Sequence, residues 1–177
     1  AAGEFITMIN RRYVYELVSD SYCRAMAKSR NEIIGRTVDE IWGEERFRGV
    51  IKEKLDRCFA GGAVSDEDWL DLPDAGRRYF HIHYYPYAEP GGQTTHAIVI
   101  SHDVTDLKQA ELGLSEAEKN YRDIVEHAEE GIFRTAPDGR FLMANKAIAA
   151  MLGYDSPEDL LNAAADVSNQ MYARPED

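Results

Sequence analysis

The sequence predicts an α+β fold built on an antiparallel sheet. Two short β-rich segments open the chain, several helical segments follow, and three longer β-rich segments come next. Helices and strands segregated along a chain in this way are typical of α+β domains. From Ser115 the order helix, strand, turn, strand and helix begins again, and it stops before three further strands appear. This internal repetition predicts one complete domain and the first half of a second.

Charge, hydropathy and cysteine content exclude several classes of protein. A formal net charge of -12 over 177 residues argues against binding to nucleic acid or to an anionic membrane surface. No apolar run approaches the ~20 residues that a membrane-spanning helix needs, and no signal peptide opens the chain. Cys23 and Cys58 lack CxxC spacing and a disulfide-dense frame, as expected in a reducing cytosol. We therefore expect a cytoplasmic protein with no nucleic-acid partner and no direct membrane contact.

The first strands and helices follow from residue types. Residues 5–9 and 13–19 are rich in aromatic and β-branched side chains, and the polar residues 10–12 between them predict a hairpin. Asp20 is expected to cap the next helix, and Thr37 with Glu40 forms a capping-box pattern for a later one. A longer amphipathic helix is predicted from apolar residues at helical spacing: Phe47, Val50, Ile51, Leu55, Cys58 and Phe59.

Three strands then complete the first domain. They are expected at 64–72, 77–87 and 94–103, separated by turns rich in proline and glycine. The acidic run 65–68 at the start of the first of these strands is interpreted as solvated surface.

A helix follows the last strand without an intervening loop. Asp103 and Thr105 lie at the changeover, where short oxygen side chains can hold the first free N–H groups of the helix. Gly113 costs this helix about 1 kcal/mol relative to alanine. Apolar or small residues recur at heptad spacing and predict a contact with a second copy; folding back over the helix's own sheet is the alternative. With Asp103 and Thr105, the predicted relay residues are Leu107, Ala110, Leu114, Ala117, Tyr121 and Ile124.

The second unit repeats the opening of the first. Strands are expected at 131–135 and 140–144 around the turn Pro137-Asp138-Gly139, and Asn145 is expected to cap the helix that follows. The predicted division is therefore a complete domain over 5–106, a linker helix over 107–128 and a half-domain over 129–177. Two strands and two helices would leave the apolar residues Phe133, Phe141 and Met143 exposed.

These motifs together resemble tandem PAS domains of bacterial sensor proteins. The run from Asp103 to Glu111 is similar to the D-[IV]-T-x-x-[KR]-x-A-E signature that ends PAS domains. Residues 31–36, NEIIGR, are similar to the segment that follows the first PAS helix, and Gly131–Arg134, Asn145 and Met151–Tyr154 match the opening half of a second domain. The resemblance implies a PAS fold with a five-stranded antiparallel sheet flanked by short helices. It says little about the ligand, because PAS domains hold many unrelated ones.

An inner pocket between the sheet and the long helix is the candidate ligand site. Tyr84 is its most informative member, since a buried phenol needs a hydrogen-bond partner that a ligand or water can supply. The alternative is that these side chains simply fill the core. The candidates are Trp42, Phe47, Ile51, Leu55, Phe80, Ile82, Tyr84, Ile98 and Ile100.

Other cofactor sites are disfavoured. His81 and His83 leave one face of a strand and could in principle hold a metal, but Phe80, Ile82 and Tyr84 form the better core face, so the histidines are expected outside and no metal site is predicted. By resemblance, haem PAS domains use a histidine on the long helix, and 44–59 contains none. The cysteine segment of photoactive flavin PAS domains is also missing. Binding of a small ligand without a covalent bond is an open alternative, and the sequence does not identify that ligand.

We therefore predict a sensory PAS module that detects a small ligand or redox state. By family resemblance it passes the signal through its C-terminal helix to an output domain in the same polypeptide, such as a histidine kinase of a two-component system or a diguanylate cyclase. A homodimer is expected through the linker helix and the sheet face. No P-loop, GxGxxG, cyclase-like or phosphoacceptor-histidine motif is found, so the chain itself is not predicted to be an enzyme. The alternative function is a ligand-free module for dimerisation and relay; a distant enzyme or carrier of similar shape has little support.

Overall fold

The computed structural model describes residues 4–88, 90–137 and 139–163. The chain divides into two compact units, Ala1–Gln109 and Ala110–Asp177, and the boundary falls inside helix α6 (Thr105–His127). The predicted turn residue Asp138 and the predicted end of the half-domain, 164–177, lie outside the described residues. The three-part division at residues 106 and 128 stays a prediction.

Unit 1 is built on one antiparallel sheet, which confirms the predicted α+β class. Its strands are β1 (Phe5–Asn10), β2 (Tyr15–Val18), β3 (Val64–Leu72), β4 (Gly76–Ala88) and β5 (Thr94–Asp103). They are ordered β2-β1-β5-β4-β3, so the first strand along the chain lies beside the last. This closure brings residues 5–10 into register with residues 96–101.

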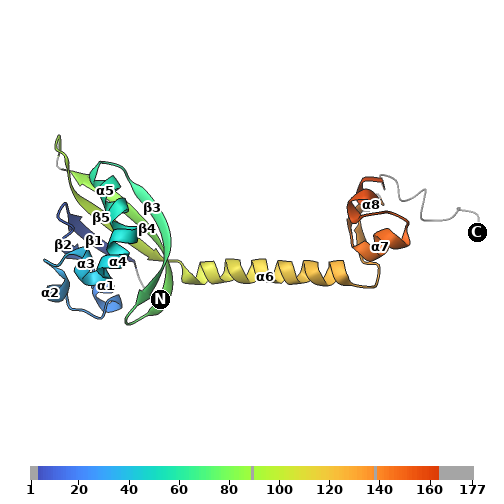
Figure 1. Ribbon diagram of the computed structural model, residues 1–177, viewed down its shortest axis with the longest axis horizontal. Helices are drawn as coiled ribbons and strands as arrows, with labels where there is room; N and C mark the ends of the chain where they lie inside the picture. The colour runs from blue at the N-terminus through green and yellow to red at the C-terminus, as the bar shows by residue number, and fades with distance from the viewer. Residues whose placement is uncertain (1–3, 89, 138, 164–177) are drawn as a thin grey trace, which may run out of the picture. The chain divides into compact units, whose positions relative to one another are not determined.

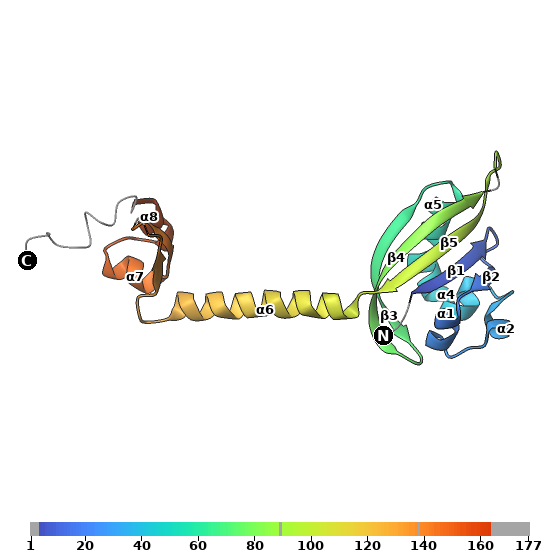
Figure 2. The ribbon, with the colours of Figure 1, turned by 180° about the vertical axis from the view of Figure 1, so that it is seen from behind.

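The helices of unit 1 lie on one face of this sheet (Figure 1). They are α1 (Asp20–Ala25), α2 (Arg30–Ile33), α3 (Val38–Trp42), α4 (Glu44–Arg46), the π-helical segment η1 (Phe47–Ile51) and α5 (Lys52–Phe59). Figure 2 shows the opposite sheet face, with no helix of unit 1 across it. The capping box of Thr37 and Glu40 forms as predicted. The cap of α1 is Ser19 rather than Asp20, because the Ser19 hydroxyl accepts the backbone N–H of Tyr22.

The core of unit 1 lies between the sheet and these helices. On β5 the inward-facing residues are Ala97, Val99 and Ser101, and all three are buried. The predicted inward positions of Ile98 and Ile100 were wrong: these side chains alternate with the buried ones and lie on the outer face. Both faces of this strand are apolar, so alternation alone could not choose between them.

Helix α6 begins at a joint that is tied by hydrogen bonds. The Asp103 carboxylate accepts the Thr105 N–H over 3.0 Å, and the Thr105 hydroxyl accepts the Tyr79 N–H over 2.9 Å. The Val104 N–H donates to the Tyr79 carbonyl over 2.9 Å. Thr105 is buried, so the start of the helix is attached to strand β4.

Unit 2 contains the strands β6 (Phe133–Thr135) and β7 (Phe141–Ala144) and the helices α7 (Lys146–Met151) and α8 (Pro157–Ala163). Asn145 caps α7 as predicted. Phe141 is buried in a small core with Ile148 and Leu160, so its predicted exposure was wrong, whereas Phe133 is exposed. None of the helices in the described part of the chain combines the length and apolar character needed to cross a membrane.

Candidate functional site: the inner cavity of unit 1

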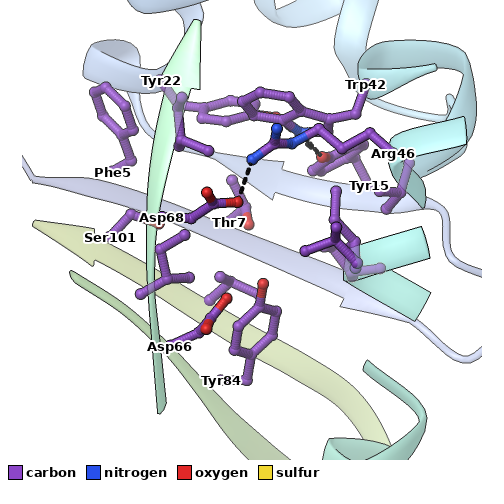
Figure 3. A pocket seen from close by; sticks show the side chains of 17 residues that line it. Phe5, Thr7, Tyr15, Tyr22, Trp42, Arg46, Asp66, Asp68, Tyr84 and Ser101 are labelled. Carbon is purple, nitrogen blue, oxygen red and sulfur yellow. Dashed lines mark hydrogen bonds and ion pairs between the residues drawn. The ribbon is translucent and has the colours of Figure 1, made fainter. Parts of the chain in front are cut away.

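A cavity of about 60 Å³ lies between the inner face of the sheet and the helical segment that runs from α3 through η1. Figure 3 shows side chains that converge on it from the sheet and the helices. The apolar part of its wall is formed by Phe5, Ile9, Val38, Trp42, Val50, Ile51, Leu70, Ile82 and Val99. Its polar part is formed by Thr7, Tyr15, Tyr22, Arg46, Asp66, Asp68, Tyr84 and Ser101.

The structure sorts the predicted pocket residues into three groups. Trp42, Ile51, Ile82 and Tyr84 line the cavity. Three others are buried in the packed core without lining it, namely Phe47, Leu55 and Phe80. Ile98 and Ile100 lie on the other side of the sheet. Whether the lining residues hold a ligand stays a prediction.

Two inward-facing carboxylates were missed, because the acidic run 65–68 was interpreted as solvated surface. Asp66 and Asp68 have the same parity on β3 as the buried Leu70. Strand alternation from Leu70 could therefore have placed both of them on the inner face. The signal was overlooked because acidic residues are rarely buried unless they are paired.

Each of these carboxylates has a cationic partner on a helix, Arg46 on α4 and Lys54 on α5. Arg46 Nη2 lies 2.5 Å from Asp68 Oδ2, and Lys54 Nζ pairs with Asp66 Oδ2. The Arg46 guanidinium also lies 5.6 Å from the centre of the Trp42 ring. Both ion pairs join the helices to edge strand β3. The pair between Arg46 and Asp68 lies in the cavity wall (Figure 3).

A buried hydrogen-bond network forms another part of the wall. The Trp42 Nε1–H donates to the Tyr22 hydroxyl over 2.9 Å and to the Tyr15 hydroxyl over 3.1 Å. The two phenols are themselves 2.9 Å apart. Burial raises the pKa of Tyr15 to about 12 and the pKa of Tyr22 well above its usual range. Both phenols are therefore neutral near pH 7.

The cavity also contains polar groups with spare hydrogen-bonding capacity. Among the described residues, Arg46 Nε is the one buried side-chain nitrogen or oxygen that lacks a hydrogen-bond partner. The Tyr84 hydroxyl lies beside Asp66 in the wall (Figure 3). Burial, followed by the negative charge of Asp66, raises the pKa of Tyr84, which keeps this hydroxyl protonated as a donor. A buried donor without a partner is rare in folded proteins and indicates water or a ligand.

The outer face of the sheet carries a histidine cluster. His81 and His83 have ring centres 4.4 Å apart, and His102 lies 6.3 Å from His83. Burial and then the neighbouring His81 and His102 lower the pKa of His83. The described residues contain no group of three or more histidine, cysteine or acidic side chains arranged to hold a metal ion.

Both cysteines are free and buried. Burial raises the pKa of the Cys58 thiol to about 11, so little reactive thiolate is present near pH 7.

Comparison with known proteins gives matches to one fold family over most of the chain. The family described as "PAS fold" matches residues 1–109, and the family described as "PAS domain" matches residues 119–176. No curated protein sequence matches the chain.

Solved structures with the same fold are distant in sequence. An RNA-binding light-oxygen-voltage receptor has a TM-score of 0.53 at 18% identity, over 70% of this chain and 36% of that one. The PAS domain of Bordetella pertussis BvgS has a TM-score of 0.51 at 17% identity, over 66% of this chain and 88% of that one. A sensory box sensor histidine kinase from Vibrio cholerae has a TM-score of 0.50 at 17% identity, over 58% and 82%.

These likenesses establish the fold alone. The chain spans 36% of the RNA-binding receptor and 51% of VqmA bound to DPO, which has a TM-score of 0.50 at 16% identity over 56% of this chain. RNA binding is a property of the first protein, and for the present chain the expected lack of a nucleic-acid partner rests on charge alone.

Proposed function

The chain belongs to the PAS family, and on that premise we propose that unit 1 is a sensory module of a cytoplasmic bacterial signalling protein. In this proposal the inner cavity detects a small ligand or a redox state. Helix α6 then relays the result to an output domain in the same polypeptide, such as a histidine kinase or a diguanylate cyclase. PAS domains are sensory rather than catalytic, so we assign no catalytic role to the chain itself.

The observation that carries the proposal is the set of polar side chains, three of them charged, in the wall of a mostly apolar cavity. A cavity that exists only through imperfect packing is lined by apolar atoms and stays dry. Here an unpartnered guanidinium nitrogen of Arg46 is buried beside the cavity. Leaving such a group without a partner costs about 1–3 kcal/mol. A bound molecule recovers this cost if the Arg46 side chain turns its Nε toward that molecule.

A short path connects the cavity to helix α6. Ser101 lines the cavity, and two residues further along β5 Asp103 holds the N–H of Thr105. The Lys108 ammonium on the first turn of α6 lies 5.3 Å from the centre of the Tyr79 ring. A displacement of β5 or β4 would therefore move the start of the helix. Small shifts at a binding site are amplified in this way when the elements packed against it have two stable arrangements.

The helix offers a surface for a second copy of the chain. The heptad residues Leu107, Leu114 and Ile124 are 71%, 63% and 70% exposed, and Tyr121 is 62% exposed. Exposed apolar residues at heptad spacing are buried when two helices form a coiled coil. We propose a homodimer through this stripe, with the outer sheet face as a second contact.

The alternative function is a PAS module that binds nothing and serves only dimerisation and relay. An absorbance spectrum and an intact native mass of protein purified without denaturant distinguish the two. Colour or additional mass supports sensing. A colourless protein of exactly the chain mass would contradict it and favour relay alone.

The dimer has its own test in Leu114→Glu, which places a charge in the heptad stripe. We expect the mass in solution to fall from dimer to monomer. The matched control is Leu112→Glu, because Leu112 is also exposed, at 52%, but lies outside the stripe. An unchanged mass for Leu114→Glu would rule out the coiled-coil contact.

A further inference from the structure

We propose that the cavity of unit 1 selects an uncharged small molecule that carries a hydrogen-bond-accepting oxygen, of the amide class. The inference rests on the sensing function proposed above and concerns the chemical class of the ligand. It follows from the charge balance of the wall, from its unused donors and from the size of the cavity.

The charges of the cavity wall are already balanced. Arg46 and Asp68 pair within the wall, and the wall residue Asp66 pairs with Lys54, which lies outside the cavity lining. The four side chains are only 19–32% exposed. A charged molecule entering this wall would lose part of its hydration without gaining an unpaired opposite charge, which is unfavourable at a site of low dielectric constant.

A carboxylate ligand would in particular have to compete with Asp68 for Arg46. If it replaced Asp68, that carboxylate would be left half-buried without its cation. A cationic ligand would displace Arg46 from Asp68 or Lys54 from Asp66, with the same consequence. A neutral molecule avoids both costs.

The unused hydrogen-bonding groups point to an acceptor oxygen. Arg46 Nε is a buried donor with no partner, and the Tyr84 hydroxyl is a donor in the same wall. Asp66 and Asp68 lie nearby as acceptors (Figure 3). A carbonyl oxygen next to an N–H group matches donors and acceptors of this kind without adding charge.

The size of the cavity limits what can enter. About 60 Å³ corresponds to roughly two water molecules at ~30 Å³ each, and it is well below the ~150 Å³ cavity that accepts benzene. The group that enters is therefore only a few non-hydrogen atoms in size and smaller than benzene. Ile51 and Ile82 are apolar lining residues that a methyl substituent of such a group can contact.

The experiment uses three probes of the same planar shape: acetamide (neutral), acetate (anion) and acetamidinium (cation). Each is titrated into the full chain at constant ionic strength while the indole N–H signal of Trp42 is followed by NMR. Trp42 lines the cavity, and Trp69→Phe identifies its signal by elimination of the other tryptophan. We expect acetamide to bind at least about tenfold more tightly than either ion. Equal or tighter binding of acetate or acetamidinium would overturn the inference.

Charge variants test the reason for the selectivity. Asp68→Asn leaves Arg46 without its counter-charge and should shift the preference to acetate, whereas Arg46→Gln leaves Asp68 alone and should shift it to acetamidinium. The double variant restores balance and should prefer acetamide again, which keeps the test decisive if a single variant fails to fold. Asp71→Asn, at an exposed position of the same strand, is the control that should change nothing.

The result also separates this inference from the proposed function. If an ion binds best, the ligand class is wrong and sensing stands. If no probe moves the Trp42 signal, the ligand class is again overturned, while the sensing function is decided independently by the native mass and absorbance of the purified protein.

Discussion

The two units cap the same helix of the PAS repeat in different ways. In unit 1 the Ser19 hydroxyl accepts the N–H groups of Ile6 and Tyr22, over 3.1 and 3.3 Å. In unit 2 the Asn145 carbonyl oxygen accepts the equivalent N–H groups of Ile132 and Ile148, both over 3.0 Å. Ser19 and Asn145 therefore occupy corresponding positions.

Asn145 does more than Ser19 because an amide also has two donors. Its Nδ2 donates to the carbonyl of Val125 in α6 over 2.9 Å and to that of Glu130 over 2.8 Å. One fully buried side chain thus joins the end of α6, the following loop, β6 and α7. The comparison teaches that unit 2, with its small core, depends on one polar residue, whereas unit 1 distributes its stability over a larger core.

The largest expected effect is that of Asn145→Ala. Removing the four hydrogen bonds of this buried side chain should lower the free energy of unfolding of unit 2 by about 4 kcal/mol, whereas Ser19→Ala should cost unit 1 about 1 kcal/mol. Amide hydrogen exchange at Ile132 and Ile148, compared with Ile6 and Tyr22, measures both. Similar losses in the two units would refute the contrast.

The next largest effect is a loss of folding stability at alkaline pH, and it is confined to unit 1. The pKa of Tyr15 is about 12 in the folded state, against about 10 when unfolded, so between these values the unfolded state alone loses its proton. Stability is therefore unaffected below pH ~10 and falls by about 3 kcal/mol as the pH rises to ~12. The Asn145 amide of unit 2 does not ionise in this pH range, so it adds no corresponding loss.

Tyr15→Phe should remove the contribution of Tyr15 to this alkaline loss. Denaturant unfolding at pH 9 and pH 11 measures it, and Tyr121→Phe is the control because Tyr121 is exposed on α6. A pH slope that is the same in Tyr15→Phe and the parent would contradict the buried-phenol account.

The smallest expected effect is that of Gly113→Ala in helix α6. Apart from its chain neighbours and the backbone of its own helix, no described atom lies within 4 Å of a Cβ built at Gly113. Gly113→Ala should therefore stabilise α6 by about 1 kcal/mol. Because Val125 of the same helix accepts a hydrogen bond from Asn145, slower exchange should extend to unit 2 while unit 1 is unchanged. Faster amide hydrogen exchange anywhere in α6 of the variant would show that the helix requires glycine at position 113.

Much of the fold could be predicted from residue patterns. The succession of strands and helices along the chain, the Thr37 capping box and the Asn145 cap follow from local spacing and side-chain chemistry. The wrong predictions arose where the local sequence supported two interpretations equally well. Ser19 and Asp20 are both good capping residues, and β5 has apolar residues on both faces.

The candidate site was only half predictable. Trp42, Ile51, Ile82 and Tyr84 were found because large apolar and aromatic residues indicate a core. Asp66 and Asp68 were missed because a carboxylate faces inward only when a cation meets it, and Arg46 and Lys54 lie 22 and 12 residues away in the sequence.

The sequence by itself determined the α+β class, the repeat and the abrupt change from strand to helix at Thr105, since these depend on neighbours within a few residues. Only the tertiary structure decided which face of β5 is buried, which cations meet Asp66 and Asp68, and that Arg46 Nε has no partner. Such features depend on sheet register and on distant ion pairs, which bring together residues that local patterns treat independently. The cavity and the ligand class we propose for it are therefore products of tertiary packing.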